Sequence, residues 1–341
     1  VVTISHAGYI KRTDADAYRK QGRGGTGIRG GATKEGDFLD HLFVVSTHDY
    51  LLFFTNRGRV YWLRVFDLPD LSRISRGRSI ANLLHMLPGE ASRAVLPVKV
   101  FEESFVFFAT AKGTVKKTPI SAYSRPRANG IIAISLDQDD ELINVERTSG
   151  ENEIVLGTRR GMAVRFDEAD VRAMGRTARG VRGMALAEGD SVVSMVAIDP
   201  GSSVLTVCEN GFGKRTSIDE YRKTRRGGKG VINIKASDRN GEVIAMQAVS
   251  DDDELMFITA GGMMLRTDLS AVREIGRATQ GVRLIRLKEE DKVVAVAKIA
   301  PEEEDENGSE QANHSEDAHD GQTGQHGEST SDGGDPTPPM S

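Results

Sequence analysis

Short apolar runs that end in a turn glycine recur along the first 300 residues of the chain. A second run of alternating apolar and polar residues follows each turn, as in "LLFFTNRGRVYWL", and this pattern predicts a β-hairpin. The turn glycines are Gly8, Gly58, Gly113, Gly161, Gly211 and Gly262. Their successive spacings are 50, 55, 48, 50 and 51 residues, so the sequence predicts six copies of one hairpin-containing unit.

Two of these turns carry a characteristic dipeptide. Asn210-Gly211 and Gly261-Gly262 are typical of two-residue hairpin turns, whose residues adopt positive φ angles. We therefore expect two-residue connections at these two positions.

A second glycine signal follows each turn glycine after about 19 residues and predicts a further short strand in every unit. The signal is a glycine and then a β-branched residue, namely Ile28, Ile131, Val181, Val231 and Val282, with Ser79-Ile80 in the second unit. The residues four positions before that glycine (or Ser79) are Arg23, Ser75, Pro126, Arg176, Arg226 and Arg277. Each unit then closes with an acidic turn and an apolar strand, as in "EGDSVVSMVAI".

Six strand-rich units of about fifty residues, without a convincing amphipathic helix, predict an all-β fold. We expect a propeller-like array of six four-stranded blades over residues 1–300. The periodicity is compatible with a closed ring and with an open spiral.

Charge is distributed unevenly along the chain, whose net charge is −5. Residues 301–341 contain twelve acidic side chains and neither Lys nor Arg, so the first 300 residues carry a net charge of +7. The terminal segment also lacks aliphatic residues other than Ala and Met, which predicts a disordered acidic tail. Its histidines, His314, His319 and His326, have a spacing that fits no metal-ligand framework, so we predict no metal site there.

The remaining composition favours a cytoplasmic protein. Cys208 is the single cysteine and lies in the apolar run "SSVLTVC", so we expect a buried thiol in a reducing compartment. No apolar run approaches the roughly 20 residues of a membrane span, and the first residues lack the pattern of a signal peptide.

The strongest concentration of positive charge is the stretch "YRKTRRGGKGVINIK" in the fifth unit. It is either a solvated basic loop or a site for a polyanion, because glycines let backbone N–H groups approach phosphate oxygens. The residues of this loop that are candidates for binding a polyanion are Arg222, Lys223, Arg225, Arg226, Gly227, Gly228, Lys229 and Gly230. The first unit has "GRGGTG" at the corresponding place, which matches a dinucleotide-binding pattern only weakly, since no βαβ unit surrounds it.

A row of cations stands four residues after the turn glycines. Its members are Arg12, Lys117, Arg165, Arg215 and Arg266, with Trp62 in the second unit. These cations are either ordinary exposed strand ends or a ring that needs a polyanion to neutralise its self-repulsion. Trp62 is expected to be a core or inter-blade residue, with a stacking platform as the alternative.

The segment "YRKQGRGGTG" and the following "DHLFVVSTHDYLLFFTNRGRVYWLRVFDLP" resemble the C-terminal domain of the bacterial DNA gyrase A subunit. "VRAMGRTARGVRGMAL" and "GRATQGVRLIRL" resemble it too, and the resemblance covers all six units and the acidic tail. The family signature is a basic box, Q-(R/K)-R-G-G-(R/K)-G. In the first unit Gln21, Arg23, Gly24, Gly25 and Gly27 match it, whereas Gly22 and Thr26 replace cations; Thr224 to Gly230 lacks only the Gln.

This resemblance implies a β-pinwheel, in which neighbouring blades exchange strands and double-stranded DNA bends around a basic rim. The wrapped DNA would pass a transport segment to the gyrase cleavage core for ATP-dependent negative supercoiling. No catalytic residue or cofactor is expected in this chain, since ATP and magnesium act elsewhere in the holoenzyme. The implied partners are the gyrase A N-terminal cleavage domain and the gyrase B subunit in an A2B2 assembly near the nucleoid, with no membrane. The expected rim residues are Arg12, Lys20, Arg29, Arg76, Arg78, Lys117, Arg125, Arg127, Arg165, Arg176, Arg179, Arg182, Arg215, Arg266 and Arg277.

Three other functions compete with DNA wrapping. Topoisomerase IV, a related enzyme, has a similar domain with degraded boxes that binds DNA without comparable wrapping. A protein-interaction propeller would instead carry an apolar patch on one face, and a propeller hydrolase would need carboxylates that converge on a central channel.

The acidic tail leads to a first prediction. Twelve carboxylates tethered to a cationic body compete with DNA for the same cations, and salt screens this competition. Deletion of residues 301–341 should tighten DNA binding or change DNA wrapping, and more so at low salt than at high salt. A salt series of binding and topology assays measures the effect, and equal results with and without the tail would refute it.

Overall fold

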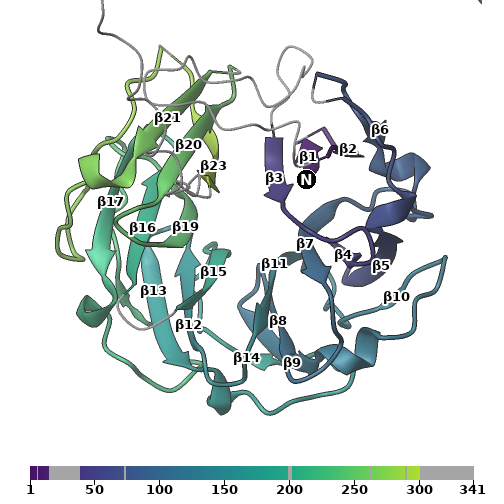
Figure 1. Cartoon of the computed structure of the whole chain (residues 1–341). Coiled ribbons are helices and arrows are strands. Elements are labelled where there is room, and N and C mark those ends of the chain that lie inside the picture. The colour runs from purple at the N-terminus through teal and green to yellow at the C-terminus, as the bar shows by residue number, and fades with distance from the viewer. Residues whose placement is uncertain are drawn as a thin grey trace, which may run out of the picture. The chain divides into compact units, whose positions relative to one another are not determined.

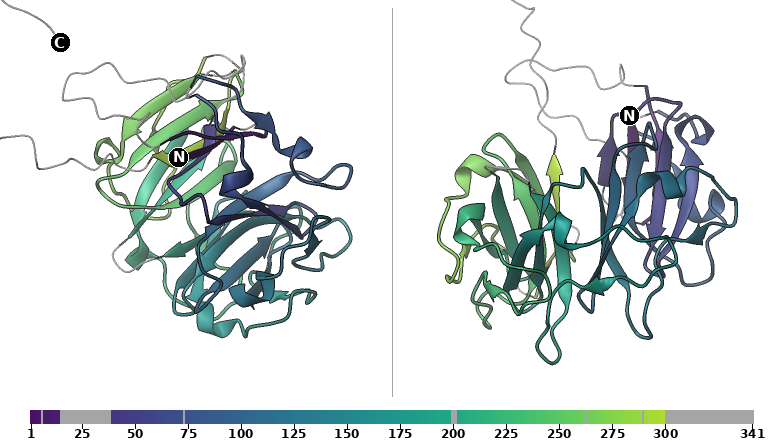
Figure 2. Two further views of the ribbon diagram at one scale, coloured as in Figure 1. Left: turned by 45° about the vertical axis from the view of Figure 1, so that its right-hand side comes forward. Right: turned by 90° about the horizontal axis from the view of Figure 1, so that it is seen from below.

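The computed structural model describes residues 1–5, 7–14, 39–72, 74–198, 202–261, 263–288 and 290–299. These residues build a six-bladed β-propeller whose blades follow one another in chain order (Figure 1). Figure 2 shows the same succession of blades from two further directions. The all-β, six-bladed fold that the repeats predict is confirmed. The predicted tail lies outside the described residues, so its boundary at residue 300 and its disorder stay predictions.

The strands of the first three blades are given from the inner to the outer edge of each sheet. Blade 1 contains β3 (Leu39–Phe43), β1 (Val2–Ser5), β2 (Tyr9–Arg12) and β6 (Arg78–Ser79). Blade 2 contains β7 (Ser92–Val98), β4 (Tyr50–Thr55), β5 (Arg59–Arg64) and β10 (Ile131–Ile132). Blade 3 contains β11 (Leu142–Thr148), β8 (Phe105–Thr110), β9 (Thr114–Pro119) and β14 (Val181–Arg182).

The last three blades repeat this order. Blade 4 contains β15 (Val192–Ile198), β12 (Glu153–Thr158), β13 (Met162–Asp167) and β18 (Val231–Ile232). Blade 5 contains β19 (Val243–Val249), β16 (Ser203–Cys208), β17 (Phe212–Ser217) and β22 (Val282–Arg283). Blade 6 contains β23 (Val293–Ile299), β20 (Glu254–Thr259) and β21 (Met264–Asp268). The helical elements of the described residues are short 3-10 turns, namely η2 (Val65–Asp67), η3 (Ile80–Asn82), η4 (Ile120–Tyr123), η5 (Glu168–Asp170), η6 (Ile218–Glu220) and η7 (Leu269–Ala271).

The outer strand of each four-stranded blade comes from the next repeat of the sequence. In blade 4, for example, β13 pairs with β18, and Met162 lies opposite Ile232. The strand exchange that the family resemblance implies is thereby confirmed for blades 1 to 5. The corresponding segment of the first repeat, which ends at Ile28, lies outside the described residues.

The middle strands of blades 2 to 5 are buried on both faces because each of these sheets is packed between two neighbours. Along β4, Leu51 and Phe53 join the core between blades 1 and 2, whereas Leu52 and Phe54 join the core between blades 2 and 3. Such strands therefore appear in the sequence as continuous apolar runs. Cys208 ends one of these strands and is fully buried, as predicted, and burial raises the pKa of its thiol to about 12.

The turn glycines are required by backbone conformation and by contact with the next repeat. Gly161 has φ +84°, and a Cβ added there would lie 2.2 Å from the carbonyl oxygen of Ile234. The Gly161 carbonyl accepts hydrogen bonds from the N–H groups of Asn233 and Ile234, at 2.8 and 3.1 Å. The same contact recurs at Gly58, Gly113 and Gly211.

The expected two-residue turn at Asn210-Gly211 is wrong. The connection between β16 and β17 is Glu209–Gly211, and the Gly211 N–H donates to the Cys208 carbonyl at 3.1 Å. Only Gly211 has a positive φ, +79°, so this is a three-residue connection in which the final glycine alone is left-handed. The second expected turn includes Gly262, which lies outside the described residues.

Alanine substitutions at three glycines should separate conformational strain from steric contact. Gly8 has φ +78° and open space around its Cα, so Gly8→Ala should lower the free energy of unfolding by about 1–2 kcal/mol. Gly161→Ala adds the clash with Ile234 and should lower the free energy of unfolding by about a further 1–3 kcal/mol. Gly175 has neither constraint and serves as the control in urea unfolding. Equal losses at Gly8 and Gly161 would contradict the steric argument.

Candidate nucleic-acid interface

The fifth-repeat loop, residues 221–230, connects η6 to the exchanged strand β18. Its glycines bring the loop backbone against the preceding repeat, because Gly230 has φ +77° and a Cβ there would lie 2.2 Å from the Ala163 carbonyl oxygen. The Gly227 N–H donates to the Gly183 carbonyl at 2.6 Å, and the Gly228 carbonyl accepts from the Ala185 N–H at 2.9 Å. Backbone contacts therefore hold the glycine-rich part of the loop against the fourth repeat.

Two of the candidate cations of this loop are used within the protein. Lys223 forms ion pairs with Glu153 at 3.0 Å and with Asp167 at 2.5 Å, and these contacts raise its pKa. The guanidinium group of Arg226 donates to the carbonyl oxygens of Asp170 and Arg182, both at 3.0 Å. Both side chains therefore contribute to the position of the loop.

The other three cations of the loop surround a cavity of about 230 Å³. Arg222, Arg225 and Lys229 line it and are exposed, and no described carboxylate lies within ion-pair distance of them. Gly228 also lines the cavity, and the described residues offer no acceptor to its N–H or to that of Lys229. Unpaired cations beside free amide groups form a suitable site for a phosphate oxygen.

The arginines four residues before the second glycine contact the strand that the preceding repeat donates. Arg277 donates from Nη1 to the Ile232 carbonyl at 2.9 Å, and Arg176 lies 3.5 Å from the Ile132 carbonyl in the same way. The Arg226 contact with Arg182 described above is the third example. These arginines are half-buried, and each connects one loop to the preceding exchanged strand along the outer edge.

In blades 1 to 5 the side chain four residues after the turn glycine contacts the next repeat. Arg165 forms a 2.5 Å ion pair with Glu153 and donates to the carbonyl oxygens of Ile218 and Tyr221, at 2.7 and 3.0 Å. Burial alone would raise the pKa of Glu153, but hydrogen bonds from Arg165 and Lys223 hold it below its usual value. The Arg165 guanidinium group therefore joins blade 4 to η6 of the fifth repeat.

The corresponding side chain of blade 2 is Trp62, and it makes the same contact as a cation. Its indole N–H donates to the Tyr123 carbonyl at the end of η4, at 2.8 Å, and the side chain is 9% exposed. The prediction that Trp62 is an inter-blade residue is confirmed. In blades 1 to 4 the shared feature at this position is a side-chain donor hydrogen-bonded to the backbone at the next 3-10 turn.

The remaining members of this row are also paired. Arg12 donates to the Leu68 carbonyl at 3.0 Å, and Lys117, which is 6% exposed, donates to the Glu168 carbonyl at 3.1 Å. The other ion pairs of the row are Arg12–Asp70, Lys117–Glu168, Arg215–Asp251, Arg215–Glu274 and Arg266–Glu254. A ring of free charge is therefore not what these residues form, although their contact with DNA stays a prediction.

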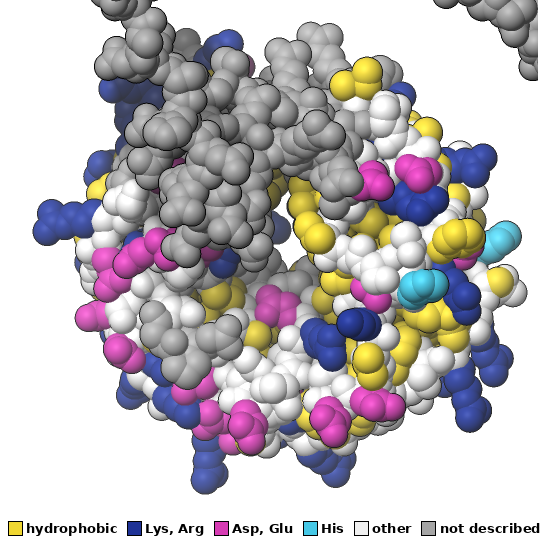
Figure 3. All heavy atoms as spheres, viewed as in Figure 1, with side chains coloured by type: hydrophobic (Ala, Val, Ile, Leu, Met, Phe, Trp, Pro, Cys, Tyr) yellow, Lys and Arg dark blue, Asp and Glu magenta, His cyan; other side chains and the backbone are white. Residues whose placement is uncertain are grey.

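The exposed rim cations lie on the segments that each repeat donates to the preceding blade. Within the described residues the structure records no ion pair for the following exposed members: Arg76, Arg78, Arg125, Arg127 and Arg182. Arg76 lies over the Tyr9 ring at 3.8 Å from its centroid, and Arg179 pairs with Asp137. Lysine and arginine side chains project along the margin of the face in Figure 3, whereas several carboxylates lie on the face itself.

The box of the first repeat lies outside the described residues. Gln21, Arg23, Gly24, Gly25 and Gly27 belong to it, and Lys20 and Arg29 flank it. Their role in DNA binding stays a prediction.

The sequence reasoning missed a row of buried lysines, which lies one residue before the row that contains Arg12, Trp62 and Arg165. Lys11, Lys116 and Lys214 each stand three residues after a turn glycine, and they are at most 3% exposed. The recurrence of lysine at this position in alternate repeats was the sequence signal that could have revealed them.

No helical element of the described residues has the length and apolarity of a membrane span. The described residues also contain no group of three His, Cys, Asp or Glu placed to bind a metal.

Known proteins resemble this chain over most of its length. A family model described as "DNA gyrase C-terminal domain, beta-propeller" matches residues 1–46, 49–84, 104–149, 152–199, 202–250 and 253–300. The chain is 49% identical over 307 residues to the DNA gyrase A subunit of Salmonella typhimurium, covering 90% of the chain and 35% of that protein. It is 44% identical over 319 residues to the DNA gyrase A subunit of Staphylococcus aureus, covering 92% of the chain and 36% of that protein. The chain thus spans about a third of the length of these relatives.

Two solved structures are similar to the fold. The C-terminal domain of DNA topoisomerase IV has a TM-score of 0.76 and 29% identity, over 87% of this chain and 92% of that one. A DNA gyrase A C-terminal domain has a TM-score of 0.71 and 28% identity, over 88% of this chain and 99% of that one.

Replacement of Arg165 by alanine should lower the free energy of unfolding more than replacement of Arg225. Arg165→Ala removes the ion pair and leaves two carbonyl oxygens without their donor, so it should lower the free energy of unfolding by about 2–4 kcal/mol. Arg225→Ala removes an exposed side chain and should change it by less than about 0.5 kcal/mol. Urea unfolding of both variants tests this, and an Arg165 variant as stable as the parent would exclude its role in joining blades.

Proposed function

The chain belongs to the family of DNA gyrase C-terminal domains, and on that basis we propose that it binds double-stranded DNA without sequence preference and wraps it along the outer edge of the propeller. The fifth-repeat loop is the observation that carries this proposal. Arg222, Arg225 and Lys229 surround a cavity of about 230 Å³ with unpaired amide groups, which suits a phosphate of the DNA backbone.

The distribution of the other cations supports a long contact rather than a single one. Exposed arginines such as Arg78, Arg125 and Arg182 lie on donated segments of successive repeats. The net charge of +7 over the first 300 residues gives the same region a long-range attraction for DNA. A duplex that follows these segments must bend, because they succeed one another around the propeller.

The described elements favour backbone contacts over base recognition. Their helical elements span three or four residues, so the described part of the chain offers no helix of the kind that enters a major groove. Any preference among DNA sequences should follow the ease with which a sequence bends.

Within the whole enzyme, the proposed role is to pass a wrapped segment to the cleavage core. The relatives are DNA gyrase A subunits, and the chain corresponds to about a third of their length. The N-terminal cleavage domain, the gyrase B subunit, the ATP-dependent supercoiling reaction and the cytoplasmic, nucleoid-associated location enter this proposal through that relationship.

A second candidate is DNA binding without strong wrapping, as in topoisomerase IV. The similarity to the solved topoisomerase IV domain, with a TM-score of 0.76, supports this second candidate. The identities of 44–49% to gyrase A subunits favour the first candidate. A change in DNA linking number on binding distinguishes the two.

The triple variant Arg222→Ala, Arg225→Ala and Lys229→Ala tests the proposal. Each lost phosphate contact should reduce the slope of log K against log salt by about 0.9, so the three together should reduce it by about 2.7. The linking-number change that the chain produces on DNA, in the presence of a relaxing topoisomerase, should decrease as well.

Lys223→Ala is the control in the same loop, since Lys223 is already paired with Glu153 and Asp167 and should leave the slope nearly unchanged. A parent chain whose binding does not depend on salt would refute DNA binding through phosphates. Binding with the expected slope but no linking-number change would favour the topoisomerase IV type.

A further inference from the structure

Three buried lysines occupy one register position in alternate blades. Lys11, Lys116 and Lys214 lie three residues after the turn glycines of blades 1, 3 and 5, and they are 3%, 0% and 0% exposed. Tyr61 and Val164 occupy this position in blades 2 and 4. Lysine is seldom fully buried unless its ammonium group has partners, so these side chains require an explanation.

All three ammonium groups donate to backbone carbonyl groups in the loop of the following repeat. Within their own repeats, Lys116 also donates to the Ala133 carbonyl and Lys214 to the Thr216 hydroxyl, the latter at 2.9 Å. Lys11 Nζ donates to the Ser75 carbonyl at 2.7 Å, and Lys214 Nζ donates to the Arg277 carbonyl at 2.6 Å. Lys116 Nζ donates to the Arg176 carbonyl. All three acceptors lie at the same position of their repeats, four residues before the second glycine (Ser79 in the second repeat).

These loops also carry candidate DNA-binding arginines. Arg176 and Arg277 provide the acceptor carbonyl, and their own guanidinium groups contact the preceding exchanged strands at Ile132 and Ile232. A lysine that holds the backbone at this residue therefore fixes the point from which the arginine side chain extends.

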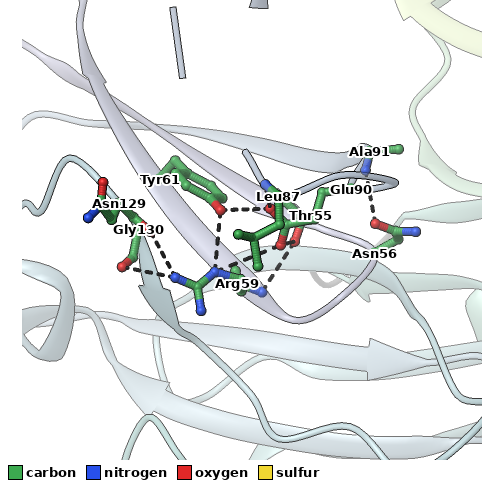
Figure 4. Close-up of polar contacts among 9 residues, drawn as sticks. All are labelled: Thr55, Asn56, Arg59, Tyr61, Leu87, Glu90, Ala91, Asn129 and Gly130. Carbon is green, nitrogen blue, oxygen red and sulfur yellow. Dashed lines mark hydrogen bonds and ion pairs between the residues drawn. The ribbon is translucent and has the colours of Figure 1, made fainter. Parts of the chain in front are cut away.

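The blades without such a lysine hold the next loop differently. In blade 2, Arg59 donates to the carbonyl oxygens of Asn129 and Gly130 at 2.8 and 3.2 Å, and Tyr61, hydrogen-bonded to Glu90, lies against Gly130 (Figure 4). In blade 4, Val164 lines the cavity beside the fifth-repeat loop. The loops of the second, fourth and sixth repeats thus share an anchor that the loops of the third and fifth repeats lack.

We propose that Lys11, Lys116 and Lys214 are positioning residues that hold the loops of the second, fourth and sixth repeats in one conformation for contact with DNA. The loop of the fifth repeat lacks this anchor and has a cavity of about 230 Å³ beside Val164 instead. This inference rests on the proposed DNA-binding function for its purpose, but the anchor itself can be tested without DNA.

Energetics separates positioning from ordinary stabilisation. Burial lowers the pKa of Lys116 and of Lys214 to about 7, so the protein environment disfavours their charged forms. Lys116 faces Arg176 and the Phe108 ring, and Lys214 faces Arg277, Glu220 and Cys208. Replacement of Lys116 or Lys214 by methionine removes the desolvation cost of a buried charge but leaves backbone carbonyl oxygens without their donor. These two effects oppose each other, so a lysine that positions its loop should change global stability little when it is replaced, whereas replacement of a lysine kept for stability should destabilise the protein strongly.

The test compares Lys116→Met and Lys214→Met with Val164→Met, which places the same side chain at the same position of blade 4. Hydrogen exchange reports on the anchor through two loop amides, Ala178 N–H, bonded to the Gly175 carbonyl, and Thr279 N–H, bonded to the Arg277 carbonyl. Loss of one charge-assisted hydrogen bond should accelerate exchange about tenfold or more at Ala178 in Lys116→Met and at Thr279 in Lys214→Met. Val164→Met should accelerate neither.

Two further measurements complete the test. The midpoint of thermal unfolding of both lysine variants should stay within about 3 °C of the parent or rise, while the double variant binds DNA more weakly and produces a smaller linking-number change. Unchanged exchange at both amides overturns the anchor, whatever the DNA result. A large fall in the midpoint overturns positioning in favour of a stabilising role. Accelerated exchange with unchanged DNA binding and topology, in a parent chain that wraps DNA, overturns the link to function.

Discussion

The contact between a turn glycine and the following repeat is the constraint on which the rest of the structure depends. The carbonyl oxygen of Gly161 accepts two N–H groups of the fifth repeat, and the glycine has no Cβ that would push the two chains apart. This contact brings each donated strand to the edge of the preceding blade and fixes the register of that pairing. The loop before the donated strand is thereby placed at the outer edge, where its cations face solvent. The same contact therefore determines both the pairing of the blades and the position of the candidate DNA-binding loops.

The fold was largely predictable because each repeat carries the same local signals. Turn glycines and apolar runs depend on sterics and burial, which act in the same way in all six copies. The error at Asn210-Gly211 arose because the dipeptide suits two turn types, and the contact of Gly211 with the next repeat selects the longer one. Strand exchange itself could not be derived from periodicity, since a strand two residues long pairs equally well in either blade; the resemblance to a known family supplied it.

The candidate interface was less predictable, because a sequence shows charges but not their partners. Arg165 and Arg225 look alike in the sequence, yet one is directed at the carbonyl groups of η6 and the other is exposed beside a cavity. Lys223 and Arg226 belong to the same basic loop as Arg225 and are paired within the protein. The tryptophan at position 62 was the informative exception, since a neutral donor in a row of cations indicates that blades 1 to 4 require a hydrogen bond, rather than a charge, at this position.

Strand exchange also determines the order in which the protein can be completed during its synthesis. The edge of β13 at Met162 remains unpaired until Ile232 has been made, seventy residues further along the chain. At about 5–20 residues per second, a ribosome needs several seconds to supply that partner. Each of blades 1 to 5 therefore exposes an open strand edge while the next repeat is being translated. Exposed edges are the part of a β-protein most prone to pair with other chains. Because each donated strand is only two residues long, only a short part of the open edge awaits its partner.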